Sequence, residues 1–83
     1  MKYKIKVPPQ FEKDFAKLDS VTQSKVLVVL ESMKEKPLFN SKKLKSVKVG
    51  CFRRRIGDFR LRFDCEKKIV CLYRVRHRKE VYR

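Results

Sequence analysis

The sequence predicts a single α+β domain in which a helical hairpin packs on one face of a mainly antiparallel sheet. Its 83 residues are enough for one domain, spanning 1–83, with a modest core. Apolar residues alternate at the start of the chain, follow helical spacing up to about residue 35, and alternate again after residue 50. The predicted order of elements is therefore β-α-α-β-β-β.

The first half of the chain supplies one strand and two helices. Residues 2–7 alternate lysine with apolar side chains, which is typical of a strand with one buried side. A Pro-Pro pair follows and favours a helix start, so we expect a helix over residues 9–18. Ser20 and Gln23 have the spacing of a capping box, which predicts a second helix over residues 20–35.

Residues 50–64 read as a β-hairpin closed by Gly57-Asp58, a two-residue turn signal in which glycine takes a positive φ. This turn fixes the register, and side chains alternate between the two faces along each strand. One face is apolar and carries Phe52, Ile56, Phe59, Leu61 and Phe63. The other face carries two opposed arginine pairs, Arg53 with Arg62 and Arg55 with Arg60.

The opposed arginines are an electrostatic liability. Like charges directly opposite each other cost about a few tenths of a kcal/mol or more per pair, so this face needs a compensating anion. Residues 42–83 hold 16 basic and 4 acidic residues and account for +12 of the net charge of +15. A concentrated basic surface indicates a polyanion partner, and the planar guanidinium suits phosphate.

Several other classes of protein are disfavoured by the sequence. No apolar segment resembles a signal peptide or approaches the roughly 18 residues of a membrane span, so we expect a soluble cytoplasmic protein without a membrane partner. Cys51, Cys65 and Cys71 are interpreted as small buried hydrophobes, because a zinc site would need a fourth ligand and His77 is the only histidine. We expect neither a metal nor a small-molecule cofactor.

Two basic segments flank the hairpin. Residues 38–49 form a connector whose lysines suit either a solvated loop or phosphate contacts on a long RNA; they are Lys42, Lys43, Lys45 and Lys48. A turn at residues 66–68 leads into an apolar strand over residues 69–76, expected to be internal and covered on both faces. Its register is open, since turns of two to four residues fit and a slip of one residue exchanges the faces.

The last seven residues contain the candidates for proton transfer. Cleavage of RNA by its ribose 2′-hydroxyl requires a base, an acid and cations that stabilise the transition state. His77 ionises closest to neutral pH, and nearby arginines would stabilise a Tyr82 phenolate. A purely structural role fits each of these two side chains equally well. Glu80 is interpreted as a salt-bridge partner of the nearby cations.

Taken together, these segments resemble the RelE family of toxins, within the RelE/ParE superfamily of type II toxin–antitoxin systems. The resemblance covers most of the chain and is strongest in residues 43–45, 51–61 and 77–83. It implies a RelE-like fold and a ribosome-dependent endoribonuclease that cuts mRNA in the ribosomal A site without metal. It also implies a RelB-like antitoxin, which we expect to be acidic where it covers the arginines.

The resemblance also assigns roles to residues. The matched catalytic positions are Arg53, Arg55, Arg60, Arg78 and Tyr82, with His77 as the alternative proton-transfer group. In the family, the arginines bind phosphate and the tyrosine or a nearby histidine acts as base or acid. The two strand positions are often lysine in the family, so arginine there shifts the base role to the C-terminal segment. Further RNA contacts are predicted at Lys43, Lys45, Lys48, Arg62, Arg76 and Arg83, with Arg76 also an alternative to Arg78.

Two other functions remain open. A ParE-type poison of DNA gyrase shares the fold but usually lacks this set of basic residues and tyrosine. A non-catalytic RNA-binding module would explain the arginines and predicts salt-sensitive binding without cleavage.

Overall fold

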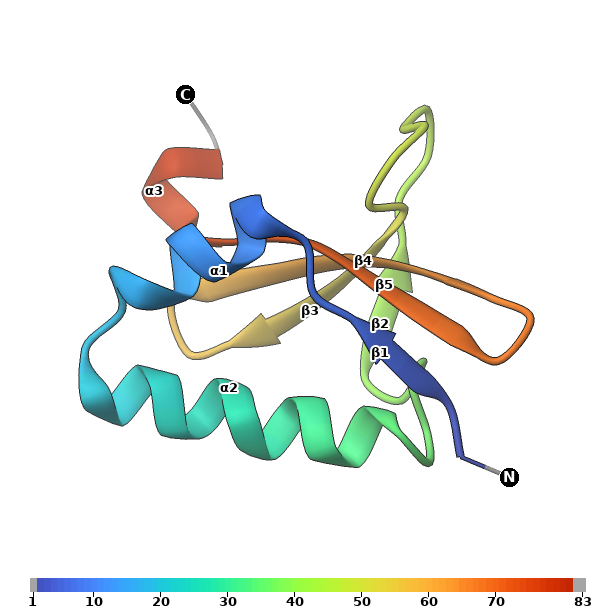
Figure 1. The fold of residues 1–83 in the computed structure, drawn as a ribbon. Coiled ribbons are helices and arrows are strands. Elements are labelled where there is room, and N and C mark those ends of the chain that lie inside the picture. Colours follow the sequence, from blue (N-terminus) through green and yellow to red (C-terminus); the bar gives the residue numbers. More distant parts are fainter. Residues whose placement is uncertain (1, 82–83) are drawn as a thin grey trace.

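The computed structural model describes the backbone of residues 2–81 and the side chains of residues 2–79 (Figure 1). The elements are β1 (Lys4–Lys6), α1 (Pro9–Ala16), α2 (Ser20–Met33), β2 (Ser41–Lys43), β3 (Phe52–Ile56), β4 (Phe59–Glu66), β5 (Ile69–His77) and α3 (Arg78–Val81). They confirm the α+β class, the two successive helices and the three long strands. The short strand β2 and the short helix α3 were not predicted.

The five strands form one sheet in the order β1-β5-β4-β3-β2. The strands β1 and β5 run parallel, and the other three neighbouring pairs are antiparallel, which confirms a mainly antiparallel sheet. Residues 38–49 were expected to be a connector without a strand, and this is wrong for the middle of the segment. There Lys42 pairs with Arg53, and β2 forms an edge strand. Such a strand has no apolar alternation to reveal it, and lysines are common on exposed edges.

The hairpin has the predicted register, with Ile56 opposite Phe59 at the turn and Arg53 opposite Arg62 farther along. Gly57 takes a φ of 60°. The next turn, left open by the sequence, contains two residues, because Glu66 pairs with Ile69. Strand β5 is internal, but Cys71 on it is exposed, so the expectation that both of its faces are covered was wrong.

The turn between β4 and β5 is strained, because Lys67 and Lys68 have φ values of 49° and 67°. A left-handed conformation costs an ordinary residue roughly 1–2 kcal/mol, whereas Asn-Gly suits a turn with two positive φ angles. The variant Lys67→Asn, Lys68→Gly is therefore expected to be more stable by about 1 kcal/mol, which raises Tm by roughly 4–8 °C in a domain of this size. Thermal unfolding followed by circular dichroism measures this shift.

The matched control for this turn is Lys67→Ala, Lys68→Ala, which removes the same two charges but keeps side chains at positive φ. An increase in Tm equal to that of the Asn-Gly variant would show that charge, not backbone strain, limits the turn.

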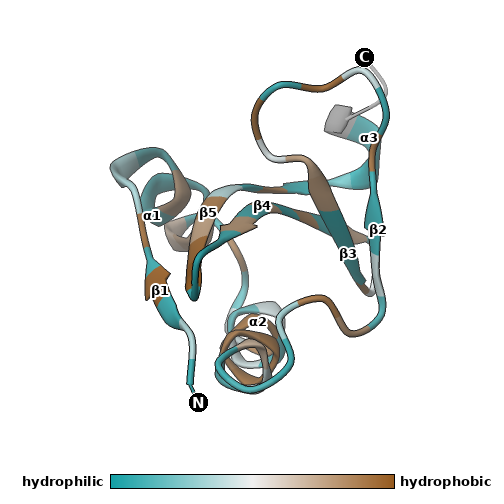
Figure 2. Ribbon diagram, turned by 90° about the vertical axis from the view of Figure 1, so that its right-hand side faces the viewer, coloured by the Kyte–Doolittle hydropathy of each residue, from teal (hydrophilic) through white to brown (hydrophobic). Residues whose placement is uncertain are grey.

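The core lies between the sheet and the helices. Helix α2 lies below the sheet in Figures 1 and 2, where it buries Val26 and Met33 against Leu61, Phe63 and the apolar residues of β5. The predicted capping box is wrong. Asp19 is the N-cap residue, and the Gln23 side chain instead donates to the Phe15 carbonyl at 2.9 Å. This bond ties the two helices together.

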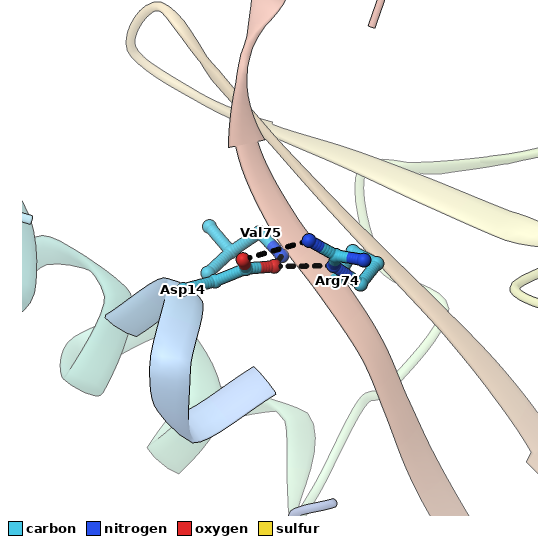
Figure 3. Close-up of polar contacts among 3 residues, drawn as sticks. All are labelled: Asp14, Arg74 and Val75. Atoms are coloured by element: carbon cyan, nitrogen blue, oxygen red, sulfur yellow. Dashed lines mark hydrogen bonds and ion pairs between the residues drawn. The ribbon is translucent and has the colours of Figure 1, made fainter. Parts of the chain in front are cut away.

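Helix α1 covers an edge of the sheet. Strand β1 pairs only with the first three residues of β5, and Asp14 of α1 accepts the Val75 amide at 3.2 Å farther along the strand. The same carboxylate receives the Arg74 Nε at 2.7 Å and Nη2 at 3.0 Å (Figure 3). Phe11, on the same helix, is buried in the core. Thus α1 completes the edge that β1 leaves open, whereas α2 covers the face.

Candidate nucleic-acid interface

Arginines from three strands form two rows across the side of the sheet opposite α2. Strand β4 pairs with β3 on one side and with β5 on the other, so that its two arginines each have two arginine neighbours. We call this side the arginine face. The row near the turn contains Arg55, Arg60 and Arg76, and the distal row contains Arg53, Arg62 and Arg74. The sequence alone indicated all of these as candidate contacts except Arg74.

Arg60 occupies the centre of the turn-proximal row and is only 8% exposed. Its Nε is buried without a hydrogen-bond partner, and its Nη1 makes one long contact of 3.4 Å to the Phe59 carbonyl. The Nε of Arg53 is likewise buried and unpartnered. Among the side chains that the structure describes, no carboxylate forms an ion pair with Arg53, Arg55 or Arg60. A buried charged donor without an acceptor is costly, so this cluster is suited to an anion from outside.

The distal row is largely occupied by the protein itself. Arg74 is paired with Asp14. Arg62 donates from Nε to the Gly50 carbonyl at 3.0 Å and from Nη2 to the Val49 carbonyl at 2.8 Å. The two rows thus differ: the distal one stabilises the fold at two of its three positions, whereas the turn-proximal one centres on an arginine without an acceptor for its Nε.

His77 lies on the opposite side of the sheet from the arginine face. It pairs with Phe59, and the two rings meet edge to face with centroids 5.2 Å apart. Its Nδ1 accepts the Lys79 amide at 3.2 Å, and its ring lines a cavity of about 360 Å³ with Asp14 and Lys17. His77 therefore does not lie on the arginine face, although Arg74 and Arg76 line the same cavity. Tyr82 and Arg83 lie outside the described residues.

The arginines of the C-terminal segment lie at two different places. Arg76 is on the arginine face, directly beside Arg60. Arg78 begins α3, where its amide donates to the Asp58 carbonyl at 2.8 Å and its Nε lies 4.0 Å from the Asp58 carboxylate. Asp58 belongs to the hairpin turn, so this contact holds α3 beside the turn-proximal row. Both arginines lie close to the turn-proximal row, so each stays a predicted RNA contact.

Loop 44–50 carries two of the predicted RNA contacts, Lys45 and Lys48, and both are exposed. The loop joins β2 to β3 and rises above the sheet, on the side away from α2, as does α3 (Figures 1 and 2). Lys43, at the end of β2, is also exposed. These lysines therefore extend the basic surface beyond the arginine rows.

The three cysteines are free thiols. Cys51 and Cys65 are half-buried, but Cys71 is exposed, so the expectation that all three are buried was wrong. The hydrogen bond to Asp64 raises the pKa of the Cys51 thiol, and burial raises the pKa of Cys65. A raised pKa keeps these two thiols protonated and poorly nucleophilic at neutral pH. Within the described residues, no three His, Cys, Asp or Glu side chains are grouped as metal ligands would be.

No helix in the described part of the chain is long and apolar enough to cross a membrane.

Three solved structures share the fold. One chain of the RelBE2 toxin–antitoxin complex from Mycobacterium tuberculosis is 24% identical with a TM-score of 0.82, and the match covers 93% of this chain and 99% of that one. A chain of the RelE–RelB complex from Pyrococcus horikoshii is 20% identical with a TM-score of 0.81, covering 94% and 97%. A chain of the RelB–RelE complex from Methanococcus jannaschii is 20% identical with a TM-score of 0.77, covering 95% and 94%.

Among curated proteins, none matches the sequence significantly. The family model described as the ParE toxin of the type II toxin–antitoxin system parDE matches residues 5–82, which is almost the whole chain. The fold, the arginine face and this match agree with the superfamily that the sequence resembles. The chain therefore belongs to the ParE toxin family, within the RelE/ParE superfamily, and is the toxin of a type II toxin–antitoxin system.

Proposed function

We propose that this toxin is a ribosome-dependent endoribonuclease that cuts mRNA in the ribosomal A site and so inhibits translation. The observation that supports this most directly is the turn-proximal row, where the buried Arg60 has an Nε without a partner between Arg55 and Arg76. A phosphodiester supplies anionic acceptor oxygens at the spacing of a guanidinium fork. The ribosomal A site would hold such a phosphate in place against the arginine face.

The reaction follows from these parts. The ribose 2′-oxygen attacks the adjacent phosphorus and loses its proton to a base, and the bond to the 5′-oxygen breaks as an acid protonates that oxygen. The products are a 2′,3′-cyclic phosphate and a 5′-hydroxyl. Arg53, Arg55 and Arg60 would stabilise the extra negative charge on the phosphoryl oxygens, and such electrostatic stabilisation often contributes most of the rate enhancement. Because His77 faces the other side of the sheet, we assign the base to Tyr82 first.

The test is an in vitro translation reaction in which mRNA cuts are mapped by primer extension. Wild-type toxin is expected to cut at the A-site codon, and the double variant Arg60→Ala, Tyr82→Phe is expected to leave the mRNA intact. Equal cutting by both proteins would rule out the proposed site. A pH–rate profile of Tyr82→Phe beside one of His77→Ala identifies the base, because only the variant that lacks it loses the corresponding ionisation.

A second function is favoured by the family match itself, whose model is named for ParE. A ParE-type toxin would trap DNA gyrase in its cleavage complex instead of cutting RNA. Purified gyrase, supercoiled DNA and the toxin discriminate between the two. DNA breaks released by detergent, together with intact mRNA in the translation reaction, would establish gyrase poisoning and exclude the endoribonuclease.

The partner that we propose is a RelB-like antitoxin with an acidic segment over the arginine face. The three structural neighbours all come from complexes of a RelE toxin with a RelB antitoxin. Carboxylates from such a segment would supply an acceptor for the unpartnered Nε of Arg60. An antitoxin that neutralises the toxin equally well after its acidic residues are replaced would contradict this arrangement.

A further inference from the structure

Loop 44–50 is fastened to the sheet by a side chain that the sequence suggested as an RNA contact. Arg62 of β4 uses its guanidinium as a fork, donating to the carbonyls of both Val49 and Gly50. These two bonds, of 2.8 and 3.0 Å, occupy donors on two of its three nitrogens. The guanidinium of Arg62 is therefore engaged largely in holding the end of this loop.

Asp64, two residues farther along β4 on the same face, holds the same turn from its amide side. Its carboxylate oxygens accept the Gly50 amide at 2.8 Å and the Cys51 amide at 2.9 Å. Burial by itself raises the pKa of Asp64, but the bonds from Cys51 and Gly50 outweigh burial and lower the pKa overall. The carboxylate is ionised at neutral pH, and its contribution is lost only as the pH falls through that lowered value.

Gly50 and Tyr73 complete the attachment. Gly50 is buried with a φ of 64°, and a Cβ there would lie 2.6 Å from Tyr73 Cδ2, so the site requires glycine. The Tyr73 ring also stacks under Arg62, whose Cζ lies 5.3 Å from the ring centroid. Tyr73 reaches this position because it is the extra residue of the β5 bulge, between the partners of Phe63 and Arg62.

We propose that Gly50, Arg62, Asp64 and Tyr73 form a loop clasp that sets Lys45 and Lys48 beside the arginine face, where they contact RNA phosphates. Arg62 is then a positioning residue, and the two lysines are the groups that touch the RNA. This proposal depends on the proposed function in one respect, namely that the bound polyanion is RNA. It extends that function by adding two lysines, held in place by the clasp, to the arginine face.

Asp64→Asn separates positioning from plain electrostatics, because it raises the net charge by one yet replaces a carboxylate oxygen with an amide nitrogen that cannot accept an N–H. Simple charge attraction predicts tighter RNA binding, whereas the clasp predicts weaker binding, by about 5-fold. Arg62→Lys keeps the charge but loses the fork and is expected to behave in the same way. The readout is the fluorescence anisotropy of a labelled single-stranded RNA of twelve nucleotides, titrated at several salt concentrations.

The salt dependence identifies the groups that are lost. Two phosphate contacts on a single strand contribute roughly 1.4 to the slope of log K against log salt, and each clasp variant should lose about this amount. Lys45→Ala, Lys48→Ala should lose the same amount, and adding Asp64→Asn to it should change nothing further. Additive losses, or Asp64→Asn binding as tightly as wild type, would overturn the inference.

Hydrogen exchange provides the control for folding. In both clasp variants the Gly50 and Cys51 amides should exchange faster, while the core amides of Leu61 and Val70 keep their protection. Unchanged exchange at Gly50 in Asp64→Asn would also contradict the clasp. These readouts need neither ribosomes nor cleavage. If the wild-type protein leaves mRNA intact, the endoribonuclease proposal is excluded, but the test of the loop clasp is unaffected. If cleavage occurs, the clasp variants should raise KM for ribosome complexes and leave kcat unchanged.

Discussion

Replacing Arg60 with alanine is expected to slow A-site mRNA cleavage by about 10²–10³-fold, the loss seen when one fixed donor to a developing oxyanion is removed. Arg60 is the most buried member of the turn-proximal row, because it is 8% exposed and lies between arginines on both neighbouring strands. Its donors therefore need little reorganisation as charge develops on the phosphate. Single-turnover cleavage at saturating toxin measures the chemical step without the contribution of binding.

Arg54→Ala is the matched control for this variant. Arg54 is in the same hairpin, but it pairs with Leu61 and its Cζ lies 5.9 Å from the Phe39 ring centroid, on the side of the sheet away from the arginine face. Its removal takes away the same charge and should change the cleavage rate less than about 3-fold by general electrostatics. Equal losses in the two variants would mean that net charge, not position, determines activity.

The stability of Arg60→Ala provides a second check. A buried guanidinium with an unpartnered Nε costs free energy in the isolated toxin, so its removal should leave the free energy of unfolding unchanged or raise it. A variant that is less active and at least as stable has lost function rather than fold. A large decrease in Tm would instead show that Arg60 supports the sheet.

The hairpin could be predicted in detail because one turn determined it. Gly57 permits a tight turn, and from that point the register of ten residues follows without further information. Strand β5 could not be predicted in this way. Its turn has lysines at both positive-φ positions, and a bulge at Tyr73 interrupts the pairing. Without the bulge, the two-residue turn would place Arg74 opposite Leu61, on the core side of the sheet.

The bulge therefore decides which side chains reach the arginine face. It places Arg74 and Arg76 there, and it sends His77 to the opposite side. Composition could not reveal this, since each of these residues is polar and compatible with either side. The role of Arg62 was equally hidden, because its partners Val49 and Gly50 are 13 and 12 residues away and offer only backbone carbonyls. Backbone acceptors have no sequence signature.

Asp14→Ala is expected to destabilise the fold by about 3 kcal/mol. The substitution breaks a largely buried ion pair and leaves Arg74 without this carboxylate. Asp14 is 8% exposed and receives three hydrogen bonds, two from Arg74 and one from the Val75 amide (Figure 3). Its loss removes all three bonds at the point where α1 covers the edge of β5. Tm should fall by roughly 12–24 °C, measured by thermal unfolding.

Glu12→Ala, on the same helix, is the control for this prediction. Glu12 is exposed, and among the described residues it makes no ion pair, so its replacement should change the free energy of unfolding by less than about 0.5 kcal/mol. Asp14→Asn keeps one acceptor oxygen and should fall between the two. If Asp14→Ala were as stable as Glu12→Ala, α1 would be held by Phe11 and its apolar neighbours alone. The ion pair with Arg74 would then serve to balance charge in the distal arginine row rather than to hold the helix on the sheet.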